Sequence, residues 1–378
     1  MTQCDREDVV PDGTAGRFSR RFRMMRQSCR RTKARRRAGR SCAFAGAMSL
    51  LLFVVLSASG NQSAAQEVKG ICLASSRGGY GTESCAAQML EIAGLGANWV
   101  ALNDYAWMNS INAPAVRYGR DGRSPEGNLA KAIENAHAAG LKVLLKPHIW
   151  SREFHGGKWH GDIEMLSEED WDKWFASYTE FLLINAHIAQ KSGADALCIG
   201  VEYEKTTHQE ARWRKLIADV RAVYSGPLCY SAAFMEWQKI AWWDAVDVIA
   251  ITAYWPVGPK DNPTDAEIRA RWNAIYAELE PFAERWKRPI VFGEIGYTTA
   301  TKTAAEPWSH DRGEAFDLQA RLYRIAIEEA QKRSFMKGVF LWKWFTDNRD
   351  GGWARGDPYT LQDKPLVIEA VKAQWSIP

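Results

Sequence analysis

The sequence of 378 residues lacks the motifs by which many enzymes hold a metal, a phosphate group or a nucleophilic serine. It has seven cysteines but no CxxC pair, and no HExxH pair occurs, so the usual sequence signatures of a bound metal are missing. A GxSxG motif is also absent, which leaves Ser-His-Asp catalysis without support. The glycine-rich residues 78–81 are not followed by GK[ST], so they do not predict a phosphate loop. We therefore expect neither a metal nor another cofactor.

The chain has no net positive charge outside its first 40 residues. The whole chain carries a net charge of +4, but residues 1–40 hold thirteen Lys or Arg and four Asp or Glu, which gives them +9. Residues 41–378 therefore carry −5. A mildly acidic main part argues against a nucleic-acid partner.

A long hydrophobic run is missing too, because the one dense apolar stretch is short for a membrane span of about 20 residues. It lies at residues 43–58, after the basic arm, and small residues follow it up to Ala65. Such an order is typical of a secretory signal. We predict that residues 1–66 are a basic arm and signal peptide, and that the protein is exported to the periplasm or the extracellular space. The alternative is an uncleaved membrane anchor formed by residues 43–58, and we expect contact with a membrane only in that case.

After residue 66, short apolar runs alternate with amphipathic helical stretches. The apolar runs are typical of buried parallel strands, and we expect eight of them: residues 68–74, 98–102, 142–146, 194–200, 227–231, 246–252, 289–293 and 338–342. Helices are expected between them, including a short fifth one over residues 234–245. Eight strand–helix units predict a single (β/α)8 barrel over residues 67–378. A doubly wound open sheet is the alternative, but no glycine-rich phosphate loop follows a strand.

Two of the expected strands end in a glutamate. Period-two alternation places Cys198, Gly200 and Glu202 on one face of the fourth strand, so that Glu202 stands at its end. Glu294 follows the seventh strand in the same way. Active sites of such barrels lie at the carboxyl ends of the strands. A single glutamate there could be paired with a nearby Arg or Lys, but two favour a catalytic pair, with Glu204 as a rival for the first position.

Glutamates at the ends of strands four and seven resemble the catalytic pair of the clan A glycoside hydrolases. More specifically, the sequence resembles glycoside hydrolase family 113, which is known for β-mannan-degrading enzymes. Most clan A families have Asn before the first glutamate; this chain has Val201, and family 113 lacks that Asn as well. The resemblance runs from about residue 69 to 376 and is carried by YGRDGRSPE at 118–126, AHAAGLKVLLKPH at 136–148, WHGDI at 159–163, CIGVE at 198–202, FGEIGY at 292–297 and KPL at 364–366.

The resemblance implies a retaining glycoside hydrolase that acts on β-linked glycans, in the first place of the mannan type, with an oligo- or polysaccharide as its partner. Glu294 would be the nucleophile, and Glu202 would protonate the leaving oxygen and then deprotonate the attacking water. The alternative is a non-catalytic glycan-binding barrel involved in envelope polysaccharide handling. The presence of both glutamates favours the enzyme, since a binding protein needs neither.

Further residues at the expected strand ends are candidates for substrate binding. Lys146 and His148 follow the third strand, and they would either bind sugar hydroxyls or support the catalytic carboxylates through ion pairs. Trp159 lies in a glycine-rich loop that could cover a subsite. Tyr254 ends the sixth strand and could donate a hydrogen bond to the nucleophile. Trp342 ends the eighth strand and is the best candidate for a sugar platform, although packing at the top of the barrel would explain it as well.

Overall fold

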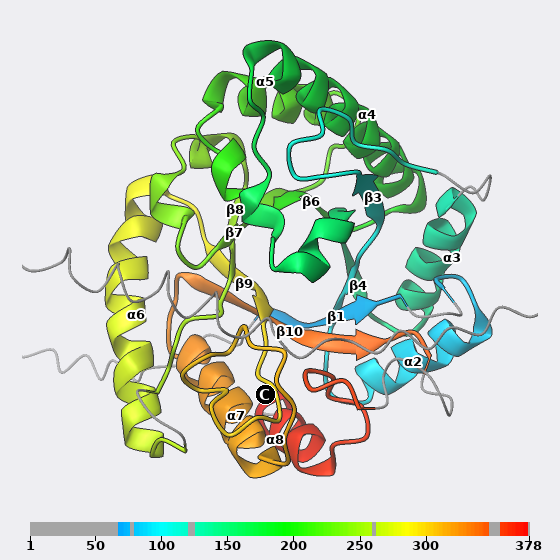
Figure 1. The fold of residues 1–378 in the computed structure, drawn as a ribbon. Coiled ribbons are helices and arrows are strands. Elements are labelled where there is room, and N and C mark those ends of the chain that lie inside the picture. Colours follow the sequence, from blue (N-terminus) through cyan, green and yellow to red (C-terminus); the bar gives the residue numbers. More distant parts are fainter. Residues whose placement is uncertain (1–66, 76–78, 120–124, 259–261, 348–355, 377–378) are drawn as a thin grey trace, which may run out of the picture. The chain divides into compact units, whose positions relative to one another are not determined.

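A computed structural model of the chain describes residues 67–75, 79–119, 125–258, 262–347 and 356–376. Eight parallel strands form a closed barrel in the order β1-β10-β9-β8-β7-β6-β4-β2, which confirms the predicted (β/α)8 fold (Figure 1). The predicted basic arm and export signal lie outside the described residues. The barrel strands are β1 Val68–Ala74, β2 Trp99–Leu102, β4 Lys142–Leu145, β6 Ala196–Val201, β7 Leu228–Ala233, β8 Val248–Thr252, β9 Ile290–Ile295 and β10 Met336–Phe345.

Seven α-helices of the described residues surround the barrel. Several begin at side chains that accept a backbone hydrogen bond, as at Thr264, where a capping box with Glu267 opens α6. No helix of the described part of the chain is both long enough and apolar enough to cross a membrane. The helices are α2 Glu83–Ala93, α3 Pro125–Ala138, α4 Glu168–Ser192, α5 Glu210–Arg221, α6 Asp265–Trp286, α7 Phe316–Gln331 and α8 Pro365–Trp375.

The prediction of a fifth helix over residues 234–245 was wrong. This segment forms two 3-10 turns, Trp237–Lys239 and Trp243–Ala245. Trp237, Trp242 and Trp243 are all buried, yet residues at these spacings cannot share one face of an α-helix. Burying three indoles therefore favours an irregular path.

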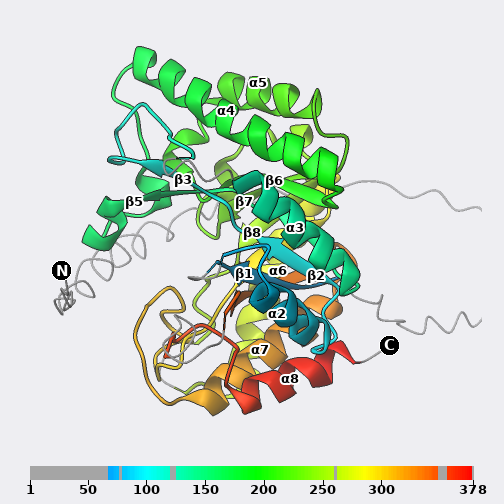
Figure 2. The same ribbon diagram turned by 90° about the vertical axis from the view of Figure 1, so that its right-hand side faces the viewer.

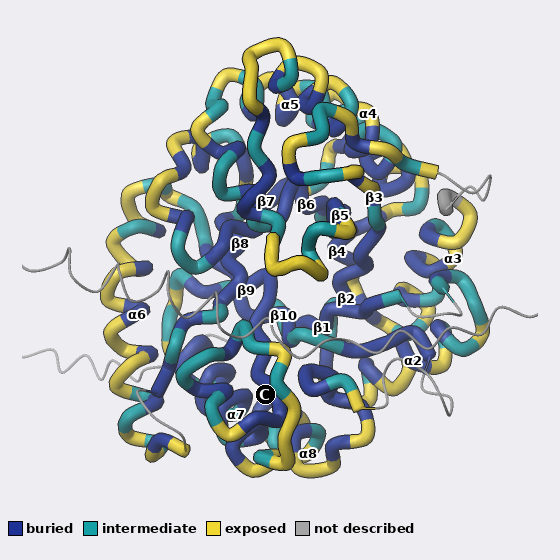
Figure 3. Tube along the Cα trace, viewed as in Figure 1, coloured by how far each residue is buried: buried dark blue, intermediate teal, exposed yellow. Residues whose placement is uncertain are grey.

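The interior of the barrel and the layer between barrel and helices form two separate cores. The inner core has mostly small and medium side chains, such as Cys72, Ala101 and Val291, together with Phe340. The outer core holds the large aromatic residues, so most of the tryptophans are structural (Figure 3 shows the buried strands and inner helix faces). The cysteines among the described residues are free thiols, and all four are buried. The buried tryptophans are Trp171, Trp174, Trp213, Trp237, Trp242, Trp243, Trp255, Trp272, Trp344 and Trp375.

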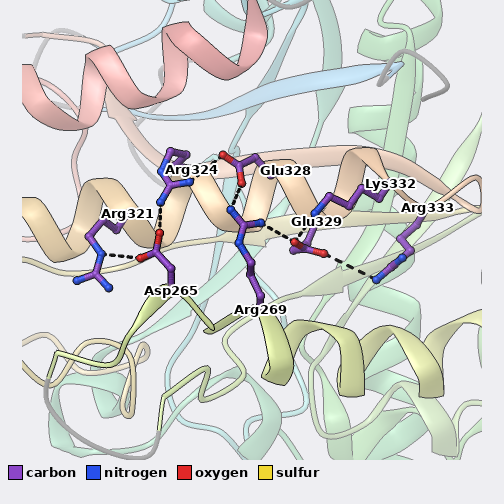
Figure 4. Close-up of polar contacts among 8 residues, drawn as sticks. All are labelled: Asp265, Arg269, Arg321, Arg324, Glu328, Glu329, Lys332 and Arg333. Atoms are coloured by element: carbon purple, nitrogen blue, oxygen red, sulfur yellow. Dashed lines mark hydrogen bonds and ion pairs between the residues drawn. The ribbon is translucent and has the colours of Figure 1, made fainter. Parts of the chain in front are cut away.

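Salt bridges join α6 to α7 (Figure 4). Arg269 of α6 contacts both Glu328 and Glu329 of α7, with its Nη1 2.6 Å from Oε1 of Glu329. The side chain of Glu329 is almost fully buried, so its charge depends on these partners. The other members of the network are Asp265, Arg321, Arg324, Lys332 and Arg333.

A small parallel sheet, which the sequence did not lead us to expect, stands beyond the barrel. Its strands are β3 Tyr105–Met108 and β5 His148–Ser151. They follow β2 and β4 after two residues each, so they extend the chain past the carboxyl ends of these barrel strands (Figure 2). Each strand carries ring-bearing side chains at alternate positions, and β5 also contains the polar residue Ser151, so neither is the uniformly apolar run that predicts a barrel strand.

Candidate active site

Both predicted carboxylates lie at the carboxyl ends of their strands. Glu202 directly follows β6, the fourth barrel strand in the chain, and Glu294 is the penultimate residue of β9, the seventh. Since all barrel strands are parallel, these ends meet at one end of the barrel.

A β-bulge precedes each of the two glutamates. In the pairing of β6 with β7, the two residues between Cys198 and Val201 oppose the single residue between Cys229 and Ser231. In the pairing of β9 with β8, Phe292 and Glu294 oppose the adjacent residues Ile251 and Thr252. A bulge bends its strand and changes the direction of the following side chains, so both strands that carry the glutamates are locally irregular just before their carboxyl ends.

Glycine occupies both bulges for a steric reason. A Cβ at Gly293 would lie 2.5 Å from Oγ of Ser231, and one at Gly200 would lie 2.9 Å from the Tyr230 ring. Neither distance leaves room for a side chain. A glycine inside an apolar strand is therefore the sequence signal that could have predicted these bulges.

The alternation used to place Glu202 was wrong in detail. A Cβ at Gly200 would face Tyr230, in the outer core, whereas Val201 belongs to the inner core together with Cys198. Glu202 leaves the strand with a left-handed backbone, at a φ of 59°. This conformation costs a non-glycine residue roughly 1–2 kcal/mol, and residues held in it cluster at functional sites.

The carboxylate of Glu202 accepts a hydrogen bond from the hydroxyl of Thr252. Thr252 ends β8, and its partner across the ladder is Glu294. Sequence reasoning missed this threonine, although its position at the end of the sixth barrel strand was a usable signal.

The carboxylate of Glu294 has a protein partner on each oxygen. Nζ of Lys146 lies 2.5 Å from Oε1, and the hydroxyl of Tyr254 donates to Oε2 over 2.9 Å. Glu294 is buried, and Lys146 is completely inaccessible to solvent. The structure thus confirms the predicted contact of Tyr254 and shows Lys146 in the supporting role rather than free to meet a sugar hydroxyl.

The surroundings give Glu202 and Lys146 distinct protonation behaviour. Burial, together with the negative charge of Glu294, raises the pKa of Glu202 to about 7. Burial disfavours the charge of Lys146, but the adjacent Glu294 outweighs it and raises the pKa of Lys146 above its ordinary value. The site therefore combines a carboxyl group that can hold a proton near neutrality with a carboxylate fixed against a lysine that keeps its proton.

His148 is buried near the ion pair of Lys146 and Glu294. Its ring centroid lies 5.4 Å from that of Tyr105 and 6.1 Å from that of His160. Burial, with the positive charge of Lys146, lowers the pKa of His148 well below its ordinary value, and burial lowers the pKa of His160 to about 4. Nε2 of His148 has no hydrogen-bond partner in the protein. A neutral imidazole with a free nitrogen can bind a hydroxyl group, which is one of the two roles that we expected for His148.

Trp342 and Trp159 differ in their relation to the carboxylates. Trp342 is half-buried, and Nζ of Lys146 lies 5.9 Å from its ring centroid, so it belongs to the site. The strand that carries it continues to Phe345 rather than ending there as predicted. Trp159 is half-buried and packs against Gly161 at the start of the turn His160–Asp162.

Glu204, the rival of Glu202, is not free for catalysis. It opens a 3-10 turn and forms a salt bridge with Lys239 at 2.6 Å. In the described part of the chain, no group of three or more His, Cys, Asp or Glu side chains is arranged to hold a metal ion.

Comparison with known proteins agrees with this geometry. The family model of Glycoside Hydrolase Family 113 matches residues 71–364. A solved structure of a GH113 β-1,4-mannanase is 25% identical, covers 83% of this chain and 100% of its own, and superposes with a TM-score of 0.72. The GH113 β-mannanase AaManA from Alicyclobacillus acidocaldarius, in complex with ManMIm, is 29% identical over 83% of this chain and 98% of its own, also with a TM-score of 0.72.

More distant structures share the fold alone. A β-glucuronidase from Faecalibacterium prausnitzii is 14% identical, with a TM-score of 0.56 over 83% of this chain and 49% of its own. A search of curated protein sequences gave no match.

Proposed function

The chain belongs to glycoside hydrolase family 113, and we propose that it hydrolyses β-linked glycans of the mannan type with retention of configuration, with Glu294 as nucleophile and Glu202 as acid/base. One observation carries the assignment of roles. The pKa of Glu202 is raised to about 7 by burial and by Glu294, whereas Glu294 is held in an ion pair with Lys146. A proton donor must hold its proton near neutrality, and a nucleophile must be ionised.

In the first step, the carboxylate of Glu294 forms a bond to the anomeric carbon while the glycosidic C–O bond breaks. Glu202 gives its proton to the departing oxygen. Lys146 and Tyr254 fix the orientation of the attacking carboxylate before the sugar arrives, so little reorganisation is required at the moment of reaction.

In the second step, Glu202 takes a proton from water, and the resulting hydroxide displaces Glu294 from the sugar. The ester formed by Glu294 carries no charge. The repulsion that helps to raise the pKa of Glu202 is then gone, so Glu202 gives up its proton more readily in the intermediate. The same residue can therefore serve as acid first and as base second.

Azide rescue tests the assignment of the two roles. Glu202→Ala should still form the intermediate from an aryl glycoside with a good leaving group but then stall for want of a base. Azide should relieve the stall and give a β-glycosyl azide, because two inversions occur. Glu294→Ala should lose turnover of every substrate, and azide should yield the α product if it restores any reaction. The opposite pair of anomers would reverse our assignment.

Folding of the variants must be checked, because Glu294→Ala leaves the charge of Lys146 buried without a partner. Circular dichroism of the variant and of the double variant Lys146→Met/Glu294→Ala provides this control. Full activity of both single variants would mean that the carboxylates are structural and that another site catalyses the reaction.

The similarity to two GH113 β-mannanases supports a substrate of the mannan type. The test is release of reducing ends from β-mannan, β-glucan and xylan, with the product lengths recorded. Highest activity on mannan is expected. A preference for xylan or β-glucan would contradict the substrate and leave the catalytic roles intact.

A further inference from the structure

We propose that Trp107 and Trp150 form a separate sugar-binding subsite on the β3–β5 sheet, where a more distant sugar residue of the bound glycan chain stacks. This inference rests on the proposed function. It concerns a pair of residues that lies outside the catalytic machinery described above.

The β3–β5 sheet has two chemically different faces. Residues alternate between the faces of a strand, and one face, with Ala106, Met108 and Ile149, is buried in the outer core. The other face carries ring-bearing side chains only, two from each strand. They are Tyr105 and Trp107 on β3 and His148 and Trp150 on β5.

The ring-bearing face begins at the catalytic centre. Tyr105 and His148 are partners across the parallel ladder, and His148 comes two residues after Lys146, which holds Glu294. Trp107 and Trp150 are partners two residues further on. At about 3.3 Å per residue this places them roughly 6.6 Å along the strand from the first pair. A glycan that leaves the catalytic carboxylates along this face would therefore meet the two indoles next.

Trp107 is exposed to solvent, and backbone hydrogen bonds and side-chain packing hold the two indoles in place. The ring centroids of Trp107 and Trp150 are 4.7 Å apart, and the rings meet at 60°. Trp107 keeps 43% of its surface exposed, whereas ten other tryptophans are buried. Its backbone is fixed by a pair of hydrogen bonds with Arg117, of 2.8 and 2.9 Å, and Trp150 packs against Phe154 and His155. An indole pair held on a strand in this way keeps apolar ring surface in water, on which the face of a ligand can pack.

A sugar suits this surface better than an apolar partner. The C–H face of a pyranose ring is apolar and packs on an aromatic ring, while its hydroxyl groups stay in water or bind polar groups at the edge. The exposed surface is that of one indole with a second one at its side, which is too small for a stable protein interface of about 800 Å² per partner.

The experiment compares substrate lengths. Trp107→Ala and Trp150→Ala are measured by kcat/KM on an activated β-mannobioside and on a β-1,4-linked mannohexaose. The ratio of hexasaccharide to disaccharide activity should fall roughly tenfold or more, as expected for the loss of one stacked ring, and Trp107→Phe should restore most of it. Trp286→Ala is the matched control. This half-buried indole ends α6 just before β9, at the opposite end of the barrel, so its removal should leave the ratio unchanged.

A ratio that stays constant in Trp107→Ala and Trp150→Ala would overturn the subsite. So would an equal loss in Trp286→Ala, because the effect would then be one of folding. A second measurement separates this inference from the proposed function. Binding of mannohexaose is measured by calorimetry in the inactive Glu202→Gln background, with and without Trp107→Ala. Weaker binding in the double variant supports the subsite even if the wild-type enzyme cleaves no mannan, and equal binding contradicts it.

Discussion

Glu202 and Glu294 have the same side chain, and their neighbours make them chemically different. Thr252 donates one hydrogen bond to Glu202, whereas Glu294 has a lysine on one oxygen and a phenol on the other. Burial and the charge of Glu294 raise the pKa of Glu202 to about 7. At the scale of single residues, function therefore depends on which groups stand beside each carboxylate.

The first prediction concerns the pH dependence of kcat/KM on an oligosaccharide. Glu202 must be protonated to act as acid, so activity should be highest below its pKa and fall as the pH rises through about 7. With an aryl glycoside whose leaving group needs no proton, the alkaline decline should weaken or vanish. An identical decline with both substrates would mean that another group titrates.

Substitution of Thr252 should shift the pH dependence of kcat/KM. Its hydrogen bond favours the ionised form of Glu202, so Thr252→Val should raise the pKa of Glu202 further and shift the alkaline decline to higher pH. Thr252→Ser keeps the hydroxyl and should keep the profile close to that of the wild type. A shift to lower pH in Thr252→Val would contradict the role assigned to this hydrogen bond.

The second prediction concerns the buried ion pair of Lys146 with Glu294. Lys146→Met leaves the carboxylate buried without its cation, which should cost about 3–5 kcal/mol in the free energy of unfolding. The double variant Lys146→Met/Glu294→Gln removes both charges and should regain a large part of that stability while remaining inactive. Urea unfolding of the two single variants and the double variant measures the coupling. Additive losses would show that the two groups do not interact.

At the scale of elements, the barrel is completed by contacts between neighbouring helices as well as by its strands. The network between α6 and α7 holds the nearly buried carboxylate of Glu329, which lies 2.6 Å from both Arg269 and Lys332. Burial opposes its ionisation, but these cations outweigh burial and lower the pKa of Glu329. This carboxylate stabilises the fold only while it is ionised.

The third prediction follows from the sign of that shift. A lowered folded-state pKa gives stability that is present above the ordinary pKa of a glutamate and is lost as the pH falls through the lowered value. Arg269→Met should therefore reduce the free energy of unfolding by about 1–3 kcal/mol at pH 7, and by less in strong acid. The control is Lys173→Met, which breaks an exposed pair on α4 and should cost much less. Equal effects of the two substitutions would show that burial of Glu329 does not matter.

At the scale of the whole molecule, the catalytic barrel and the first 66 residues raise separate questions. We propose that residues 1–66 direct export and are removed near Gln66, on the basis of the basic arm, the short apolar stretch and the small residues after it. N-terminal sequencing of the protein from its native host is the test. A mature chain that begins near residue 66 is expected, whereas a membrane-bound chain that retains residues 43–58 would favour the anchor. Soluble cytosolic protein that begins at residue 1 would contradict export.

The barrel itself was predictable from local sequence. A strand buried on both faces must be apolar throughout, so the eight strands are visible as short apolar runs, and the bounds of β1 were predicted to the residue. The two glutamates proposed as catalytic could be found for the same reason, because a charge at the end of an apolar strand stands out. The fifth helix was predicted wrongly, since the burial of Trp237, Trp242 and Trp243 depends on neighbours distant in sequence.

The sequence by itself thus determined the order of strands and helices and the two carboxylates at the strand ends, since these depend on apolar patterns over a few residues. Tertiary structure decided how the carboxylates differ. Lys146 and Glu294 are 148 positions apart, and Glu202 and Thr252 are 50 apart, so only closure of the barrel brings them together. It also placed Trp107 beside Trp150 through the pairing of β3 with β5. Charge and hydrogen bonding act over a few ångströms through space, and no local pattern in the chain records those distances.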